Sequence, residues 1–347
     1  MASAKKLPSG KWRVLLFVGK DENNKRKYRS FTADTKKEAE FLAAQYNQLH
    51  IEANRSEQTL REAAERYIKS KENILSASTI RGYYAVLKNY LSGLFAVKIK
   101  DITAETIQIA FNDFAKSYSA KTCRNAHGLV SIVLKIERPD LRLKTTLPQK
   151  DKHDIYVPDE QEIKEILMFT AGTNIEIPFI LATQCGLRAS EISGLDKSCV
   201  FEDHIEIKCA RVDGLDGAVL KKPKSFSGFR SIPISKEIYD ILISKANGER
   251  ICPMTSTSIS SAWGKFREKH GIDTRCNFHA LRHHFASRCL LLGIPQKYIA
   301  ELMGHSSLDM IEKVYQHIFP SAMEEFAELI RRKDSELMQH KMQHKNK

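Results

Sequence analysis

The stretch Leu147–Asp154 (LPQKDKHD) constrains the fold of this chain more than any other sequence feature, because it separates parts of different pattern. It is polar, contains Pro148 and lacks hydrophobic periodicity, which is typical of a linker between domains. The chain of 347 residues is also too long for one ordinary hydrophobic core. We therefore predict a multidomain protein with a boundary near residue 150.

Residues 1–55 are predicted to form a small sheet with one helix. Alternating apolar residues from Trp12 to Val18 indicate a strand with one buried face, and Lys27–Thr32 resumes a strand pattern after a turn. Thr35 and Glu38 have the spacing of a capping box, which predicts a helix through about Gln48.

Residues 56–150 are predicted to be entirely helical. Thr59 and Glu62 form a second capping box, and apolar residues then recur at helical spacing up to Leu134. Residues 151–333 mix helices with strands expected at His204–Val212 and Phe229–Ser235, and residues 334–347 form a polar tail. The predicted class is thus α+β multidomain, with a mainly helical third domain that contains a small antiparallel sheet.

The positive charge of the chain is unevenly distributed. The formal net charge is +13, with 12 basic against 6 acidic residues in 1–55, 16 against 9 in 56–150, and 27 against 27 in 151–347. Such asymmetry favours a nucleic-acid partner, although a basic protein kept soluble by lysines is the alternative. The candidate DNA contacts, which could equally belong to a solvated face, are Arg13, Lys27, Arg29, Lys121 and Arg124.

Several protein classes are excluded by composition. The sequence has no apolar run of about 18 residues, so we expect no membrane span. Its first residues, MASAKKLPSG, lack the apolar stretch of a secretory signal. Seven cysteines without a CxxC pair argue against disulfides and a zinc site, and we expect a cytoplasmic protein without metal or cofactor.

Four segments after the linker contain residues suited to catalysis. Each is weak alone, since an arginine in a helix is usually a surface residue and a lone tyrosine is usually half-buried. A zinc reading of His279 and His283 fails for want of a third ligand and of a glutamate base. The segments are Ala182–Leu195 (ATQCGLRASEISGL), Lys221–Ile234 (KKPKSFSGFRSIPI), His279–His284 (HALRHH) and Leu302–His317 (LMGHSSLDMIEKVYQH).

Together, in this order and spacing, the segments resemble the catalytic domain of the tyrosine recombinases, the family of phage and conjugative-transposon integrases. The stretch before the linker resembles the core-binding domain of that family, and residues 1–55 resemble the arm-binding domain of mobile-element integrases. The resemblance implies a catalytic set of Arg188, Lys224, His279, Arg282, His305 and Tyr315, supported by Glu191. Lys221 and Lys222 are alternatives to Lys224.

The chemistry of these residue types agrees with the resemblance. A tyrosine can hold a phosphate covalently, and arginines can neutralise the charge that develops on the nonbridging oxygens. A lysine can protonate the departing 5′-oxygen, and histidines can act as a base or hydrogen-bond partner. Glu191 lies three residues after Arg188, on the same helical face, where it can orient the site.

The resemblance also implies partners. These are double-stranded DNA attachment sites of core and arm type, a homo-tetramer in the synaptic complex, and DNA-bending or excision accessory proteins. It implies an enzyme that integrates and excises a mobile element in the bacterial nucleoid through a 3′-phosphotyrosine. The alternatives are a type IB topoisomerase, a chromosome-dimer-resolving recombinase and a DNA-binding protein without activity; residues 1–55 argue against the first two, and the full catalytic set argues against the third.

Overall fold

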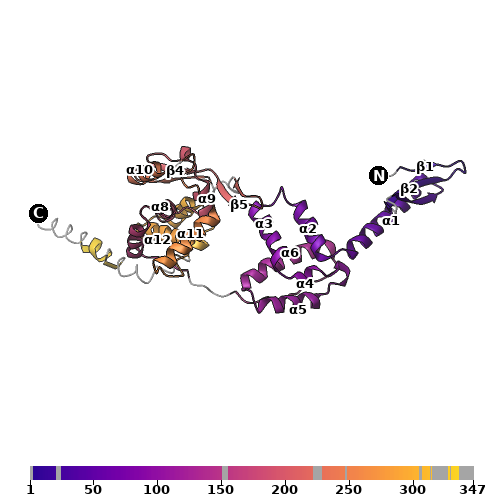
Figure 1. The fold of residues 1–347 in the computed structure, drawn as a ribbon, viewed down its shortest axis with the longest axis horizontal. Helices are drawn as coiled ribbons and strands as arrows, with labels where there is room; N and C mark the ends of the chain where they lie inside the picture. Colours follow the sequence, from indigo (N-terminus) through magenta and orange to yellow (C-terminus); the bar gives the residue numbers. More distant parts are fainter. Residues whose placement is uncertain are drawn as a thin grey trace. The chain divides into compact units, whose positions relative to one another are not determined.

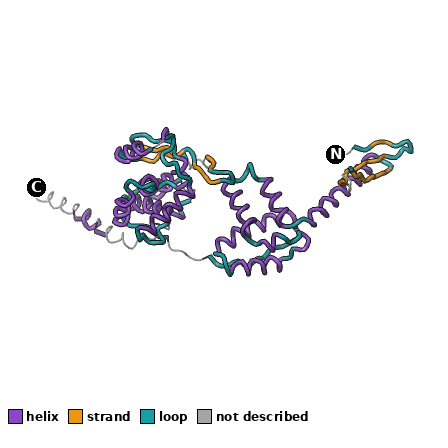
Figure 2. The backbone as a smooth tube through the Cα atoms, in the orientation of Figure 1, coloured by secondary structure: helices purple, strands orange, loops and turns teal. Residues whose placement is uncertain are grey.

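A computed structural model describes residues 3–20, 25–150, 155–221, 229–246, 248–304, 307–312, 314, 327–328 and 330–335. It divides into two compact units, Met1–Asp151 and Lys152–Lys347, with the division inside the predicted linker. The first unit begins with a sheet and one helix and continues as a helical bundle, whereas the second combines helices with short strands (Figures 1 and 2). The further division of the first unit near residue 55 stays a prediction.

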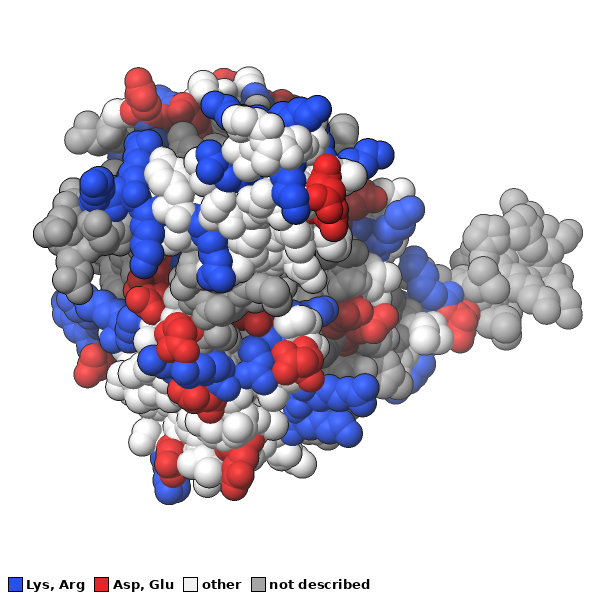
Figure 3. Space-filling model, turned by 90° about the vertical axis from the view of Figure 1, so that its right-hand side faces the viewer, with Lys and Arg blue, Asp and Glu red and all other residues white. Residues whose placement is uncertain are grey.

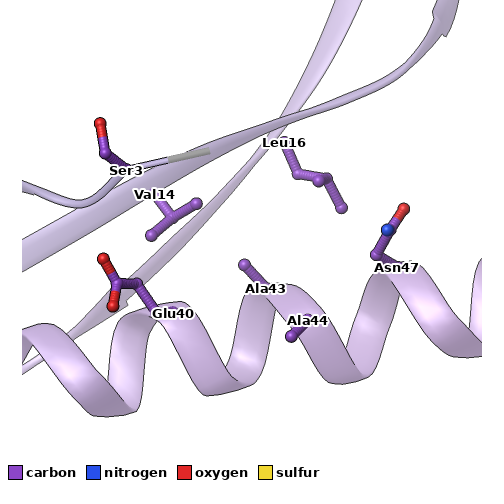
Figure 4. Close-up of a pocket in the computed structure, with 7 residues that line it drawn as sticks. All are labelled: Ser3, Val14, Leu16, Glu40, Ala43, Ala44 and Asn47. Atoms are coloured by element: carbon purple, nitrogen blue, oxygen red, sulfur yellow. The ribbon is translucent and has the colours of Figure 1, made fainter. Parts of the chain in front are cut away.

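The N-terminal sheet is three-stranded and antiparallel. It consists of β1 (Lys5–Lys6), β2 (Trp12–Lys20) and β3 (Arg26–Ala33), and α1 (Lys36–Glu57) packs on one face. Val14, Ala33, Ala39 and Ala43 are buried between them and form a small core. Alanines on the helix leave a hollow of about 290 Å³ against β2, and Figure 4 shows its lining side chains on β2, on α1 and at Ser3.

Helix α1 is longer than we predicted. It was expected to extend to about Gln48, but it runs to Glu57. Residues 49–57 (LHIEANRSE) contain neither glycine nor proline, so nothing in the local sequence ends the helix. The predicted boundary at residue 55 therefore falls inside its last turn.

The rest of the first unit is a bundle around one apolar core. The Thr59–Glu62 capping box is present, since the Glu62 backbone N–H donates to Thr59 Oγ1 at 3.2 Å and the Thr59 N–H donates to Glu62 at 2.8 Å. Ile107, Phe111, Val130 and Leu134 are among the buried residues, as their helical spacing predicts. The elements are α2 (Leu60–Ser70), α3 (Ala77–Asn89), α4 (Ser92–Phe95), η1 (Ile99–Asp101), α5 (Ala104–Ala115) and α6 (Ala120–Glu137).

The second unit is built around two central helices, α8 (Glu176–Cys185) and α12 (Phe278–Leu291), which pack against each other. Both are buried over most of their surface, as expected of helices that other elements cover on all sides. The surrounding helices are α7 (Glu160–Thr170), α9 (Ala189–Gly194), η2 (Lys197–Cys199), α10 (Lys236–Lys245), α11 (Ser256–Lys269) and α13 (Gln296–Met303).

The strands of this unit form two small sheets instead of the single sheet we predicted. The expected strand at His204–Val212 is interrupted, because β4 (His204–Ile207) pairs with β7 (Arg230–Pro233), whereas β5 (Ala210–Asp213) pairs with β6 (Ala218–Lys221). Both pairs are antiparallel. The change of partner after Ile207 breaks the strand, and β6 was not predicted.

Among the described helices, none has the length and apolar character needed to cross a membrane.

Candidate active site

The site begins at the tight connection between α8 and α9. Helix α8 ends at Gly186, which has a left-handed backbone (φ 64°). A Cβ atom at this position would lie 2.5 Å from the ring of Phe285 on α12, so glycine is required by both backbone and packing. Arg188 follows as the N-cap of α9, and its backbone N–H donates to the Glu191 carboxylate at 2.9 Å.

Glu191 is a buried carboxylate on which three arginines converge. Arg188 Nη1 donates to Glu191 Oε1 at 2.7 Å. Arg230, from β7, approaches in a bidentate manner, with Nη1 3.1 Å from Oε1 and Nη2 2.8 Å from Oε2. Nη1 of Arg282, from α12, lies 3.7 Å from Glu191 Oε2. Elements far apart in the sequence thus meet at one carboxylate.

The same three arginines bind the C-terminal end of α13. Arg230 Nε donates to the carbonyl oxygen of Leu302 at 2.6 Å, Arg282 Nη2 to that of Met303, and Arg188 Nη2 to that of Gly304 at 2.9 Å. These carbonyls have no partner within their own helix, and the negative end of the helix dipole favours cations there. Three successive carbonyls therefore fix three guanidinium groups immediately before His305 in the sequence.

The electrostatics of the cluster keep it positively charged. Burial raises the pKa of Glu191, but the hydrogen bonds and charge of Arg230, with the charges of Arg282 and Arg188, outweigh it and lower the pKa to about 2. The carboxylate is therefore ionised at neutral pH. Three guanidinium groups face one carboxylate, which leaves an excess of two positive charges available to an anion.

His279 is next to this cluster on α12. The Asn277 side chain accepts from the backbone N–H groups of His279, at 2.9 Å, and Ala280, at 3.2 Å, which starts the helix. Restricted access of water to the ring, followed by the charges of Arg282 and Arg188, lowers the pKa of His279 to about 4. His279 is therefore neutral at pH 7, and a ring nitrogen can accept a hydrogen bond.

The structure brings together four of the predicted catalytic and supporting residues, namely Arg188, Glu191, His279 and Arg282. Lys224, its alternative Lys222, His305 and Tyr315 lie outside the described residues. Lys221, the other alternative, ends β6. Among the described residues, no group of three or more His, Cys, Asp or Glu side chains could hold a metal ion.

Arg230 belongs to the cluster, although we did not predict it as a site residue. The sequence contained a signal for it, because alternation along a strand places Arg230 on the same face as the apolar Ile232. The structure shows that Ile232 is buried. An arginine that points inward needs a carboxylate partner. The pattern Arg230-Ser231-Ile232-Pro233 could therefore have been interpreted as a buried ion pair.

Residues 157–321 match the family described as "Phage integrase family". The matched stretch includes the whole arginine cluster. Residues 157–321 therefore form a domain of the tyrosine recombinase type. "Tyrosine recombinase XerC-like" of Caldanaerobacter subterraneus subsp. tengcongensis is 24% identical, over 89% of this chain and 93% of the relative. The transposase of transposon Tn916 from Enterococcus faecalis is 26% identical, over 57% of this chain and 56% of its own length.

Solved structures support the fold of the recombinase. The integrase of transposon Tn1549 (its residues 82–397) matches with a TM-score of 0.64 at 20% identity, over 79% of this chain and all of that one. A lambda integrase matches with a TM-score of 0.60 at 19% identity, over 90% of this chain and 94% of that one. The predicted α+β multidomain class is thereby confirmed.

The residues predicted to contact DNA have different surroundings in the recombinase. Arg13 lies on the face of the N-terminal sheet opposite α1, because Val14, the next residue, is buried against the helix. Arg29 lies on the α1 side, where it donates to Tyr46 Oη at 2.9 Å and lies over its ring; Lys27 shares that side by alternation. We therefore retain Arg13 as the sheet residue best placed for DNA.

The two predicted DNA-contact residues of α6 also differ from each other. Lys121 is exposed in the first turn of the helix, where a phosphate contact is sterically open. Arg124 Nη2 donates to the carbonyl oxygen of Pro148 at 2.6 Å and is part-buried, so this guanidinium anchors the start of the linker. It also lines a hollow of about 540 Å³ between α3 and α6 with Tyr83 and Asn125.

The buried Glu191 carboxylate should stabilise the second unit measurably. Glu191→Gln keeps the side-chain shape but leaves the arginines without their counter-charge. We expect it to lower the free energy of unfolding by about 3–5 kcal/mol, as is usual when one partner of a buried ion pair is removed. Urea denaturation followed by the fluorescence of the buried Trp263, in a Trp12→Phe background, measures this change.

A matched control and the pH dependence distinguish this effect from a general loss of charge. Asp240→Asn removes the exposed partner of Lys236 on α10, and we expect it to change the free energy by less than about 0.5 kcal/mol. Since folding lowers the pKa of Glu191 from 4.5 to about 2, its stabilisation should be complete above pH 4.5 and decrease as pH falls toward 2. Equal effects of the two substitutions would contradict the assignment.

Proposed function

We propose that this protein is a site-specific DNA recombinase, the integrase of a mobile element, which cuts and rejoins DNA through a 3′-phosphotyrosine on Tyr315. The excess positive charge at the buried arginine cluster is the observation that carries the proposal. A pentacoordinate phosphorus places growing negative charge on its nonbridging oxygens, and rigidly held guanidinium groups stabilise that charge. Arg188 and Arg282 are held by Glu191 and by the end of α13 before any substrate arrives.

The reaction that fits these residues is a reversible transesterification. The Tyr315 oxygen attacks the scissile phosphorus, the bond from phosphorus to the 5′-oxygen breaks, and Lys224 supplies a proton to that oxygen. His279 and His305 accept or share the phenol proton. The 5′-hydroxyl of a partner strand then attacks the phosphotyrosine and releases Tyr315. One phosphodiester is replaced by another at each exchange, so the reaction needs no ATP.

The proposed partners follow from the relatives. Structures of the Tn1549 integrase contain transposon right-end DNA and circular-intermediate DNA, and a lambda integrase has been solved as a tetramer bound to a Holliday junction. We propose core-type and arm-type DNA sites and a homo-tetramer for this protein, because exchange between two duplexes requires four cleavable strands. Its place of action would be the bacterial nucleoid, and DNA-bending or excision proteins would assist it.

A covalent-adduct assay tests the function directly. The probe is a duplex with the junction sequence of the mobile element that carries the gene, labelled at one end and nicked near the cleavage position. Wild-type protein should yield a complex that survives denaturing electrophoresis and disappears on proteolysis. Specific binding without any adduct would indicate a DNA-binding protein and refute the proposal.

The sheet at the N-terminus supports a second DNA contact. Its face opposite α1 presents Arg13 with the exposed side chains of Leu15, Phe17 and Tyr28, and a three-stranded sheet can enter a DNA groove. In the view of the protein surface in Figure 3, Lys and Arg side chains are interspersed with uncharged and acidic ones. We propose that residues 1–55 bind an arm-type site, separate from the site of strand exchange.

Removing residues 1–55 should separate the two activities. The truncated protein 56–347 keeps Glu57, which forms ion pairs with Lys98 and Lys100 of the helical bundle. We expect it to bind and cleave core-site DNA and to lose recombination between full-length attachment sites. An adduct assay measures cleavage of core-site DNA, and a recombination assay measures exchange between full-length attachment sites. Unimpaired recombination by the truncated protein would show that this unit is dispensable.

A further inference from the structure

Arg230 is the arginine of the cluster that has no assigned role, and its side chain is almost completely enclosed. Only 6% of its side chain is exposed, compared with 34% for Arg188. All three of its side-chain nitrogens have protein partners: Nη1 and Nη2 donate to Glu191 at 3.1 and 2.8 Å, and Nε donates to Leu302 O at 2.6 Å. A guanidinium bound in this way is unsuited to contact a phosphate itself.

Its partners are the groups that hold the other two arginines. Glu191, which Arg230 binds with both Nη atoms, also accepts from Arg188 at 2.7 Å and lies 3.7 Å from Arg282. Leu302, which Arg230 binds with Nε, precedes the two residues whose carbonyls accept from Arg282 and Arg188. Arg230 therefore joins β7, α9 and α13 in one hydrogen-bonded network, and both ends of that network lead to the phosphate-binding arginines.

We propose that Arg230 is a positioning residue for strand cleavage, which fixes the guanidinium groups of Arg188 and Arg282 by holding Glu191 and the end of α13. This inference rests on the proposed recombinase function. It predicts a defect in the chemical step rather than in DNA binding, because the binding surface of the protein is unaltered when Arg230 changes. Loss of an outer group that orients the reactive ones typically costs about 10–100-fold in activity.

The test compares Arg230→Gln and Arg230→Lys with the wild type in the full-length chain. Each protein is incubated in single-turnover experiments with nicked attachment-site DNA that has either a normal phosphate or a methylphosphonate at the cleavage position. A methylphosphonate is uncharged, so its cleavage depends far less on charge-neutralising arginines. Arg188→Ala is the reference for a lost arginine. Lys236→Gln, which removes an exposed ion pair on α10, is the matched control.

On the phosphate substrate, Arg230→Gln should cleave about 10–100-fold more slowly than wild type, with nearly unchanged DNA affinity. The cleavage rate of Arg230→Lys should lie between those of Arg230→Gln and wild type. An ammonium group keeps the charge but cannot bind both Glu191 and Leu302 as the planar guanidinium does. On the methylphosphonate substrate the Arg230→Gln defect should shrink to a few-fold, as for Arg188→Ala, whereas Lys236→Gln should match wild type on both substrates. If Arg230→Gln does not fold, Arg230→Lys provides the same comparison.

Two results would overturn the inference. One is wild-type cleavage by both Arg230 variants, and the other is a defect of equal size on the two substrates, which would indicate a general structural role. A wild-type protein that forms no adduct on normal DNA would instead refute the recombinase function, so the two failures can be distinguished.

Discussion

Tyr315→Phe should produce a protein that binds attachment-site DNA normally and forms no detectable covalent adduct. Tyr315 lies ten residues after His305, the position of the nucleophile in the family that the chain resembles. The substitution removes one oxygen atom and leaves the ring, so packing and DNA contacts are retained. Without that oxygen no phosphotyrosine can form, and we expect a complete loss rather than a reduced rate.

The experiment needs a matched tyrosine. Tyr298→Phe removes the hydroxyl of an exposed tyrosine on α13, in the same unit and only 17 positions away, and should leave adduct formation unchanged. Mobility-shift titrations give the affinity of each variant, and denaturing electrophoresis gives the adduct. An adduct that persists in Tyr315→Phe would show that another residue is the nucleophile.

Arg188→Ala and Arg282→Ala should each lower the single-turnover cleavage rate by at least about 10²–10³-fold, the usual effect of removing one donor to a developing oxyanion. Their effects on stability should differ. Only 1% of the Arg282 side chain is exposed, and it donates to the carbonyls of Gly186 and Met303, so alanine there also leaves buried carbonyls without donors. Arg188 is 34% exposed, and its loss should affect mainly the rate.

Lysine substitution tests the geometry of the arginines. Arg188→Lys preserves the charge but cannot bind Glu191, Gly304 and a phosphate through a planar fork. We therefore expect incomplete rescue of cleavage, with thermal unfolding near that of the wild type. Cleavage at the wild-type rate by Arg188→Lys would contradict a bidentate role.

The sequence was most informative where spacing alone determines the arrangement. Glu191 lies in the first turn of α9, three residues after the N-cap Arg188, so their contact could be predicted from their spacing. Capping boxes predicted the starts of α1 and α2 for the same reason, because they need only neighbouring residues.

Contacts that depend on tertiary structure were not predictable in this way. The inward direction of Arg230 follows from the pairing of β7 with β4, and the strand expected at His204–Val212 hid the exchange of partners after Ile207. Arg29 was expected on a DNA-binding face, but the register of β3 with β2 places it beside Tyr46. No sequence pattern indicates which backbone carbonyls accept from arginines, since every residue has one.

The arginine cluster is held partly by side chains and partly by backbone carbonyls, and this difference determines which amino-acid substitutions the protein can tolerate during evolution. Glu191 is the counter-charge of three guanidinium groups, so a change of Glu191 alone leaves buried positive charge uncompensated, whereas a change of Arg230 alone leaves Glu191 paired with Arg188 and Arg282. Glu191 is therefore the more tightly constrained of the two positions. The end of α13 carries no such restriction, because carbonyls 302–304 are supplied by any amino acid. Variation there is limited by packing at the fully buried Met303 and by the left-handed backbone of Gly304 (φ 61°), and not by the chemistry that the carbonyls support.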